Sequence, residues 1–303
     1  MNPSHFHLIL DGNYAFREGF VALPGQPPRR GDIPIKDFSR FLEALRSLPD
    51  SASLRHSDGI LYRLTRYAVR DGFAVVAVPT WRPPASLSDL SGAAPIARAL
   101  ELVVGRTGLI LFMGDMAAGK TTTATTFLLE ALRRTGGTAF AWMDPVEYDL
   151  EGSHGDGYCH QLEIATHEYR AAAVAAKRSR ARYLFFGETR TPETAIAVLD
   201  AGLSGPLTLT TSHGDSLING LLAFLAKAEA VDPRAPQLLA AALTAAFHLT
   251  LRHVAGAPTL TVASLIVSPS PADSIRAMIR AGNVEGMGTE IRRQQSEQAR
   301  LLT

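Results

Sequence analysis

The sequence predicts an α/β fold in two parts, a small α+β domain followed by a larger domain built on a parallel sheet. The chain has 303 residues, 46% of them hydrophobic, which suggests two domains with a large buried core. Residues 79–86 are dense in proline, as in a linker. Beyond them, apolar strand-like runs alternate with helix-like stretches, which is typical of a parallel sheet covered by helices. We therefore expect an N-terminal domain at 1–96 and a second domain at 97–303.

The first domain is predicted from alternating apolar residues and one amphipathic stretch. The expected strands are Phe6–Leu10, Gly59–Tyr67 and Phe73–Val78, and the expected helix is Ile35–Leu48. A short helix within Leu87–Val104 then leads into the second domain.

The second domain opens with a strand, a glycine loop and a helix. Leu109–Met113 is short and apolar, and Thr121–Arg134 follows a helical pattern. Between them, Gly-Asp-Met-Ala-Ala-Gly-Lys-Thr has the spacing of a phosphate-binding loop, in which main-chain N–H groups at a helix N-terminus converge on phosphates. The sequence thus predicts ATP bound with Mg²⁺. The expected binding residues are Gly114, Asp115, Met116, Ala117, Ala118, Gly119, Lys120, Thr121 and Thr122, with Lys120 on the β- and γ-phosphates and Thr121 ligating Mg²⁺.

Three further strands are expected to end in polar groups. These strands are Gly137–Trp142, Tyr183–Phe186 and Pro206–Thr211, and they alternate with helices at Glu168–Arg178 and Thr191–Ala201. The polar groups that follow the strand ends are Asp144 and Glu147, then Glu188, then His213. Because the carboxyl ends of parallel strands meet at one edge of a sheet, we expect these side chains to face the nucleotide.

Composition limits the other function classes. The net charge of +1 gives no field that would steer the chain to nucleic acid, and the single Cys159 suits a reducing cytoplasm. We expect a cytoplasmic protein that reaches a membrane only through partners, since no apolar run reaches spanning length. A zinc site is an alternative for His154, Cys159, His160 and His167, but their spacing matches no closed zinc pattern and the glycines among them favour a mobile loop.

The order and spacing of these motifs resemble the secretion and pilus ATPase superfamily of the PilT/GspE type. The shared motifs are the glycine loop, Asp-Pro-x-Glu-Tyr, Gly-Glu-x-Arg and Thr-x-His, and the resemblance covers about residues 101–302. Gln161–Ile164 and Ser274–Asn283 resemble segments of the pilus-retraction branch. Lys177–Arg180 resembles the arginine-rich approach of its relatives in conjugation and Dot/Icm-type secretion. The resemblance is therefore nearest to these branches.

The resemblance implies a PAS-like N-terminal domain joined to a RecA-like P-loop NTPase core, assembled as a homo-hexamer. It implies a motor ATPase that powers type IV pilus retraction or a related secretion or conjugation machine. Such a protein would work in the bacterial cytoplasm, peripheral to the inner membrane, through a membrane platform protein and without direct nucleic acid contact. By the same resemblance, Glu188 polarises the lytic water, Glu147 assists it or the metal shell, and His213 senses the γ-phosphate. Arg178, with one or more of Arg63, Arg66 and Arg70, would stabilise transition-state charge across a subunit boundary.

Four positions depart from the resemblance, and two alternative functions stay open. Met143, Thr191, Pro206 and Val174 stand where relatives usually carry Glu, Asp, His and Arg. A nucleotide-switched assembly protein with little turnover is therefore an alternative. An unrelated phosphotransferase is disfavoured, because no arginine-rich lid segment follows the glycine loop.

The C-terminal segment carries one more expectation. In Ser274–Asn283 we expect Ile275, Met278 and Ile279 to pack on the core, while Arg276 and Arg280 form an exposed surface that couples the ATPase to its machine.

Overall fold

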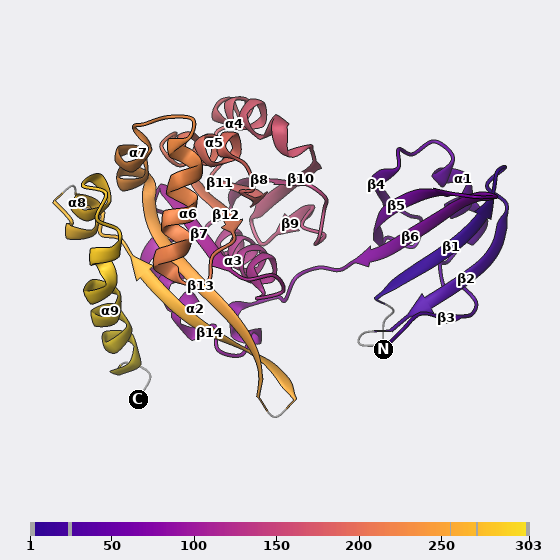
Figure 1. Ribbon diagram of the computed structural model, residues 1–303, viewed down its shortest axis with the longest axis horizontal. Helices are drawn as coiled ribbons and strands as arrows, with labels where there is room; N and C mark the ends of the chain where they lie inside the picture. Colours follow the sequence, from indigo (N-terminus) through magenta and orange to yellow (C-terminus); the bar gives the residue numbers. More distant parts are fainter. Residues whose placement is uncertain (1–3, 24–25, 255, 271, 301–303) are drawn as a thin grey trace. The chain divides into compact units, whose positions relative to one another are not determined.

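The computed structural model describes residues 4–23, 26–254, 256–270 and 272–300. It divides into two compact units. The first is Met1–Arg82 with Pro145–Asp149, and the second is Pro83–Asp144 with Leu150–Thr303. Each unit contains its own sheet, labelled in Figure 1.

The first unit is an antiparallel sheet of six strands with one helix, in the order β3-β2-β1-β6-β5-β4. Its elements are β1 (His5–Asp11), β2 (Phe16–Ala22), β3 (Arg29–Arg30), α1 (Phe38–Leu45), β4 (Ser51–Arg55), β5 (Leu61–Val69) and β6 (Gly72–Thr80). Phe41 and Leu45 of α1 are buried against the sheet, in one cluster with Leu8 and Tyr62. The expected α+β character is confirmed, and the extra strands β2, β3 and β4 complete the sheet.

The second unit is built on a sheet of eight strands, in the order β14-β13-β7-β12-β11-β8-β10-β9. The six central strands are parallel, and antiparallel partners flank them at both edges. The strands are β7 (Gly108–Gly114), β8 (Gly137–Met143), β9 (Gly152–His154), β10 (Gly157–Glu163), β11 (Tyr183–Glu188), β12 (Leu207–Ser212), β13 (Leu243–Val254) and β14 (Ala257–Ile266).

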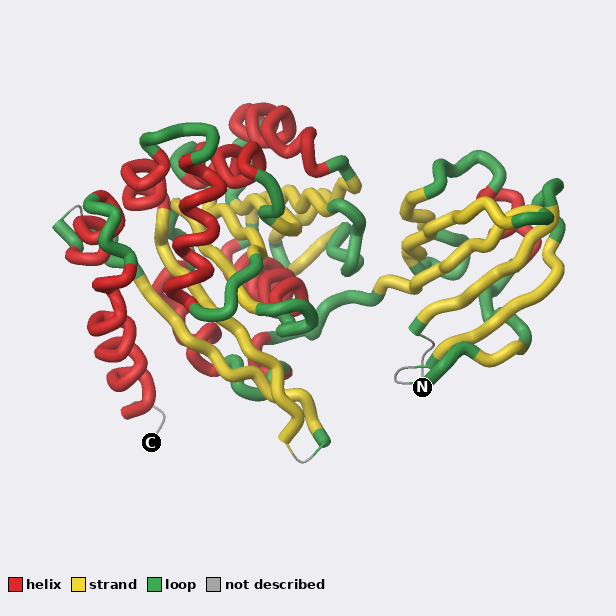
Figure 2. The backbone as a smooth tube through the Cα atoms, viewed as in Figure 1, coloured by secondary structure: helices red, strands yellow, loops and turns green. Residues whose placement is uncertain are grey.

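Helices cover both faces of this sheet (Figure 2). They are α2 (Ala94–Val103), α3 (Lys120–Thr135), α4 (Tyr169–Arg178), α5 (Pro192–Gly202), α6 (Leu217–Glu229), α7 (Ala235–Ala242), α8 (Ser274–Arg280) and α9 (Gly288–Arg300), with short 3-10 turns at Leu87–Asp89, Thr166–Glu168 and Glu285–Met287. Helices thus enclose a largely parallel sheet, as the sequence predicts.

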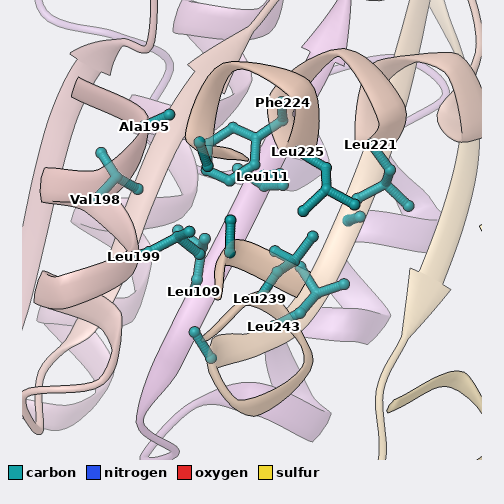
Figure 3. Close-up of a cluster of buried hydrophobic side chains, with 14 of the residues drawn as sticks. Leu109, Leu111, Ala195, Val198, Leu199, Leu221, Phe224, Leu225, Leu239 and Leu243 are labelled. Carbon is teal, nitrogen blue, oxygen red and sulfur yellow. The ribbon is translucent and has the colours of Figure 1, made fainter. Parts of the chain in front are cut away.

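The side chains of the central strand β7 alternate between two buried layers. Leu109 and Leu111 pack among residues of α5, α6 and α7, including Leu199 and Phe224 (Figure 3). On the other face, the ring of Phe112 lies 5.7 Å from that of Phe127 in α3. Burial on both faces explains why this strand is apolar throughout, and it anchors the loop that follows.

Two regions differ from the sequence-based expectations. The glycine-rich segment expected to be a mobile loop forms β9 and β10, and β10 pairs in parallel with β8. Beyond β12 the sequence analysis names no strand, whereas β13 and β14 form a long hairpin whose first strand pairs with β7. In the first case short strands with several glycines lack an alternating pattern, and in the second an alanine-rich run spans the junction between α7 and β13.

Candidate active site

The sheet topology brings the predicted motifs to one edge. Strands β7, β8, β11 and β12 are parallel, and their carboxyl ends lead into the glycine loop, Asp144, Glu188 and His213, respectively. In the register, Glu188 lies beside Thr211, and Ser212 lies beside Met113. Since β12 separates β11 from β7, Glu188 lies about two interstrand spacings, or roughly 10 Å, from the strand that carries the loop. This edge therefore gathers chemically active groups, as predicted.

The glycine loop has the backbone that phosphate binding requires. Gly114 has φ 152°, and a Cβ at this position would lie 2.4 Å from the carbonyl oxygen of Leu249, so only glycine fits. Gly119 has φ 83° and precedes the first turn of α3. Asp115, Met116 and Ala117 are exposed at the tip of the loop. The loop thus opens onto solvent at the N-terminus of a long helix, which favours anion binding.

Lys120 is held across the loop. It is buried, and its Nζ donates to the carbonyl oxygens of Gly114 at 3.0 Å and Asp115 at 2.7 Å. The ammonium group therefore lies inside the glycine loop. The hydroxyl-bearing Thr121 follows on the first turn of α3 and is partly exposed.

The carboxylate of Glu188 lies between two side chains. Its Oε2 accepts from Arg190 Nε at 2.7 Å, and its Oε1 lies 2.9 Å from His213 Nε2. The Glu188 side chain is 19% exposed, whereas His213 is 56% exposed and reaches into solvent. The hydrogen bond to Glu188 raises the pKa of the Arg190 guanidinium, which stays charged. The structure thus joins Glu188 to His213, and it adds Arg190.

Asp144 lies in the same group of charges. Its Oδ2 accepts from Thr166, from the backbone nitrogen at 2.7 Å and from the hydroxyl at 2.6 Å. Burial raises the pKa of Tyr169, with a further contribution from the charge of Asp144. Asp144 and Tyr169 also contribute to the raised pKa of Arg190. The quoted motifs contain Asp144 and Arg190, but only the fold shows that they belong together.

Two of the four positions that depart from the family resemblance, Met143 and Thr191, have structural roles. Met143 is buried, and its sulfur accepts from Gln161 Nε2 at 3.2 Å. Thr191 caps α5, since its hydroxyl accepts from the backbone nitrogen of Thr194 at 3.3 Å. Neither position supplies a carboxylate to this edge, so Asp144 and Glu188 are the acidic groups next to Arg190.

The other predicted catalytic groups are not joined to Glu188. Arg178 is the exposed last residue of α4, and among the described residues no contact links it to Glu188. Glu147 is exposed in the segment that belongs to the first unit. Arg66 is occupied inside its own domain, 2.7 Å from Asp50 and with its guanidinium 5.5 Å from the ring of Tyr14. Arg66 therefore has partners within the first unit.

A pocket adjoins the start of α3. It measures about 260 Å³, and Gly119 and Thr122 meet Leu90, Leu251 and Leu260 in its lining. This lining is largely apolar, and the glycine loop lies directly beside it.

Two of the four residues considered for zinc have other partners in the part of the chain that the structure describes. No group of three or more potential metal ligands forms there. His154 is buried and bonds through Nε2 to the carbonyl oxygen of Leu150 at 2.9 Å, and His160 stacks on Phe140 with 5.1 Å between ring centroids. Among the described helices, none combines the length and hydropathy that crossing a membrane requires.

Solved structures with a similar fold include a pilus retraction motor and the ATPase DotB. A crystal structure of the pilus retraction motor PilT with bound ADP matches with a TM-score of 0.74 at 21% identity, over 96% of this chain and 85% of that one. The ATPase DotB of Legionella pneumophila matches with a TM-score of 0.72 at 16% identity, over 96% of this chain and 84% of that one. At these identities the likeness concerns the fold, an N-terminal domain followed by a RecA-like core, and confirms the expected fold class.

Sequence relatives match over less than half of this chain. The putative type II secretion system protein E of Escherichia coli K12 is 33% identical over 132 residues, which are 43% of this chain and 26% of that protein. The type II secretion system protein HxcR of Pseudomonas aeruginosa is 32% identical over 120 residues, 38% of this chain and 24% of that protein. The matched part thus spans about a quarter of these relatives. The sequence model of the type II/IV secretion system protein family matches residues 88–248, more than half of the chain, and the protein therefore belongs to this family.

Proposed function

We propose that this protein hydrolyses ATP with Mg²⁺ and acts as a ring-forming motor of a type IV pilus or a related secretion or conjugation machine. The observation that supports hydrolysis best is the Glu188 carboxylate, held by Arg190 and His213 at the strand edge that carries the glycine loop. Among these machines we favour pilus retraction, because Gln161–Ile164 and Ser274–Asn283 resemble segments of the pilus-retraction branch.

The residues at the carboxyl ends of these strands would have different roles in phosphoryl transfer. Lys120 would leave the loop carbonyls and contact the β- and γ-phosphates as they arrive. The base and ribose would occupy the pocket between Leu90 and the β13–β14 hairpin. Each carboxylate oxygen has a second lone pair, so Glu188 can accept a hydrogen bond from water while Arg190 and His213 keep it in place. His213, largely exposed, is then placed to report on the γ-phosphate through its bond to Glu188.

The donor atoms fit magnesium. The Thr121 hydroxyl and the carboxylates of Asp144 and Glu188 are hard oxygen ligands of the kind that Mg²⁺ selects. We assign Thr121 as its protein ligand, and the bound ion would neutralise charge that develops on the phosphates.

The carboxylate is tested by Glu188→Gln in steady-state ATP hydrolysis, with ATP binding measured in parallel. We expect binding to persist and turnover to fall by about two to four orders of magnitude, because the amide cannot accept the proton. Glu229→Gln, an exposed carboxylate on α6, is the matched control and should match wild type. Normal turnover in Glu188→Gln would show that another residue is the base, with Glu147 as the next candidate.

The same assay separates the alternative, a nucleotide-switched assembly protein. This alternative is favoured by Met143. Its buried thioether, bonded to Gln161, stands where relatives usually carry the carboxylate of a glutamate. Loss of a group near the metal shell costs roughly tenfold or more. Wild-type turnover no faster than that of Glu188→Gln, with tight ATP binding in both, would favour the switch.

A further inference from the structure

A cavity of about 610 Å³ lies at the end of β7 remote from the glycine loop. Gly108, the first residue of β7, lines it, whereas the loop follows Gly114 at the other end of the strand. Six residue steps of about 3.3 Å separate the two ends, so the cavity lies roughly 20 Å from the loop. Its volume is in the range of small-ligand pockets, and it is separate from the nucleotide site.

Three arginines give this cavity its charge. Arg106, at the end of the turn after α2, meets Arg276 and Arg280, which occupy successive turns of α8. The described lining residues include no aspartate or glutamate. Asp273 lies close by, but its Oδ1 accepts from the backbone nitrogens of Ile275 at 2.9 Å and Arg276 at 3.2 Å and so caps α8. Positive charge therefore exceeds negative charge around the cavity.

The hydrogen bonds of two of these arginines go to neutral acceptors. Arg106 Nη2 donates to the carbonyl oxygen of Val267 at 2.8 Å, and Arg276 Nε donates to that of Ser268 at 3.0 Å. Burial lowers the pKa of both guanidiniums. The charge of Asp273 opposes this shift on both, while repulsion from Arg276 on Arg106 and from Arg280 on Arg276 adds to it. Asp273 attracts both cations, but it also caps α8, and an anion between the three guanidiniums would relieve the repulsion among them.

We propose that this cavity is a binding site for a small organic anion with two or more negative charges, carried by carboxylate or phosphate groups. Planar guanidinium groups match both oxyanions through paired N–H donors. Gly105, Gly108 and Gly202 add no side chains to the lining, and Leu203 adds an exposed apolar contact. The site lies at the opposite end of β7 from the catalytic edge, so its occupant differs from the ATP proposed there.

The test is calorimetric titration of the full chain with its nucleotide site saturated by ADP and Mg²⁺. Tricarballylate is the carboxylate probe and 3-phosphoglycerate the phosphate probe, and binding of either one supports the proposal and identifies the preferred chemistry. Arg280→Gln should weaken that binding at least tenfold, since it removes a charged donor. Arg280→Lys should retain part of it, because charge persists without the planar fork.

Arg252→Gln, an exposed arginine on β13, is the matched control and should bind like wild type. Circular dichroism of each variant verifies the fold. The proposal is overturned if neither probe binds the wild-type protein, if Arg280→Gln binds as tightly as wild type, or if Arg252→Gln weakens binding to the same extent. Because the readout is binding, its outcome is independent of whether the protein hydrolyses ATP.

Discussion

Arg276 is buried, and its replacement by alanine should destabilise the second unit. The expectation that Arg276 and Arg280 form an exposed surface is wrong for Arg276, which is 8% exposed. Its guanidinium donates to the carbonyl oxygens of Ser268, Ala240 and Ala241. The last two belong to the final turn of α7, where carbonyls lack partners within the helix. The apolar part of the expectation is confirmed, since Ile275 and Ile279 are buried and Met278 packs against the core.

The size of the effect follows from these bonds. Arg276→Ala leaves three carbonyl groups without their donor, at a cost of about 1 kcal/mol each, so we expect a loss of about 3 kcal/mol in the free energy of unfolding. In a domain of about 200 residues, 1 kcal/mol shifts Tm by roughly 2–4 °C, which gives a drop of roughly 6–12 °C. Thermal unfolding followed by circular dichroism measures this directly.

Arg280→Ala is the control from the same helix. Arg280 is exposed one turn further on, and its charge lowers the pKa of Arg276, so its removal should change stability by less than about 0.5 kcal/mol. A melting curve for Arg276→Ala within about 2 °C of wild type would refute the capping argument. The comparison also guides the interpretation of cellular experiments. A loss of transport in Arg276→Ala would result from a destabilised fold, whereas a loss in Arg280→Ala would result from a missing contact of the exposed Arg280 side chain.

Three further predictions concern the nucleotide site. Lys120→Ala should abolish tight ATP binding in calorimetry, because no other cation lies in the loop sequence, and unchanged affinity would contradict the assignment. His213→Gln should lower kcat about tenfold or more while ATP affinity stays within about threefold, since Glu188 loses a partner and not a phosphate ligand; equal kcat would leave His213 a structural role. Specific activity should fall on dilution as rings dissociate, and a constant value down to a proven monomer would exclude catalysis across subunits.

Local sequence determines the parts of the site that depend on one strand and its next turn. The apolar run of β7, the glycines at the loop and the lysine that follows lie within one short stretch, so the strand, the loop and the helix after it could be predicted. Glu188 could be predicted for the same reason, as the end of an apolar strand. Alternating strands and helices then predicted a parallel sheet, but not the order of its strands.

Long-range pairing determines the remainder, and no local pattern encodes it. Helical spacing places Arg276 and Arg280 on adjoining turns, but whether that face is exposed depends on α7, whose carbonyls approach from about 35 residues earlier in the chain. The same holds for Asp144, which accepts from Thr166, and for Glu188, which His213 reaches from the next strand. A charged residue in an amphipathic helix therefore has two physical outcomes, solvation or capping of a neighbouring helix, and only the packing of α8 on α7 selects between them here.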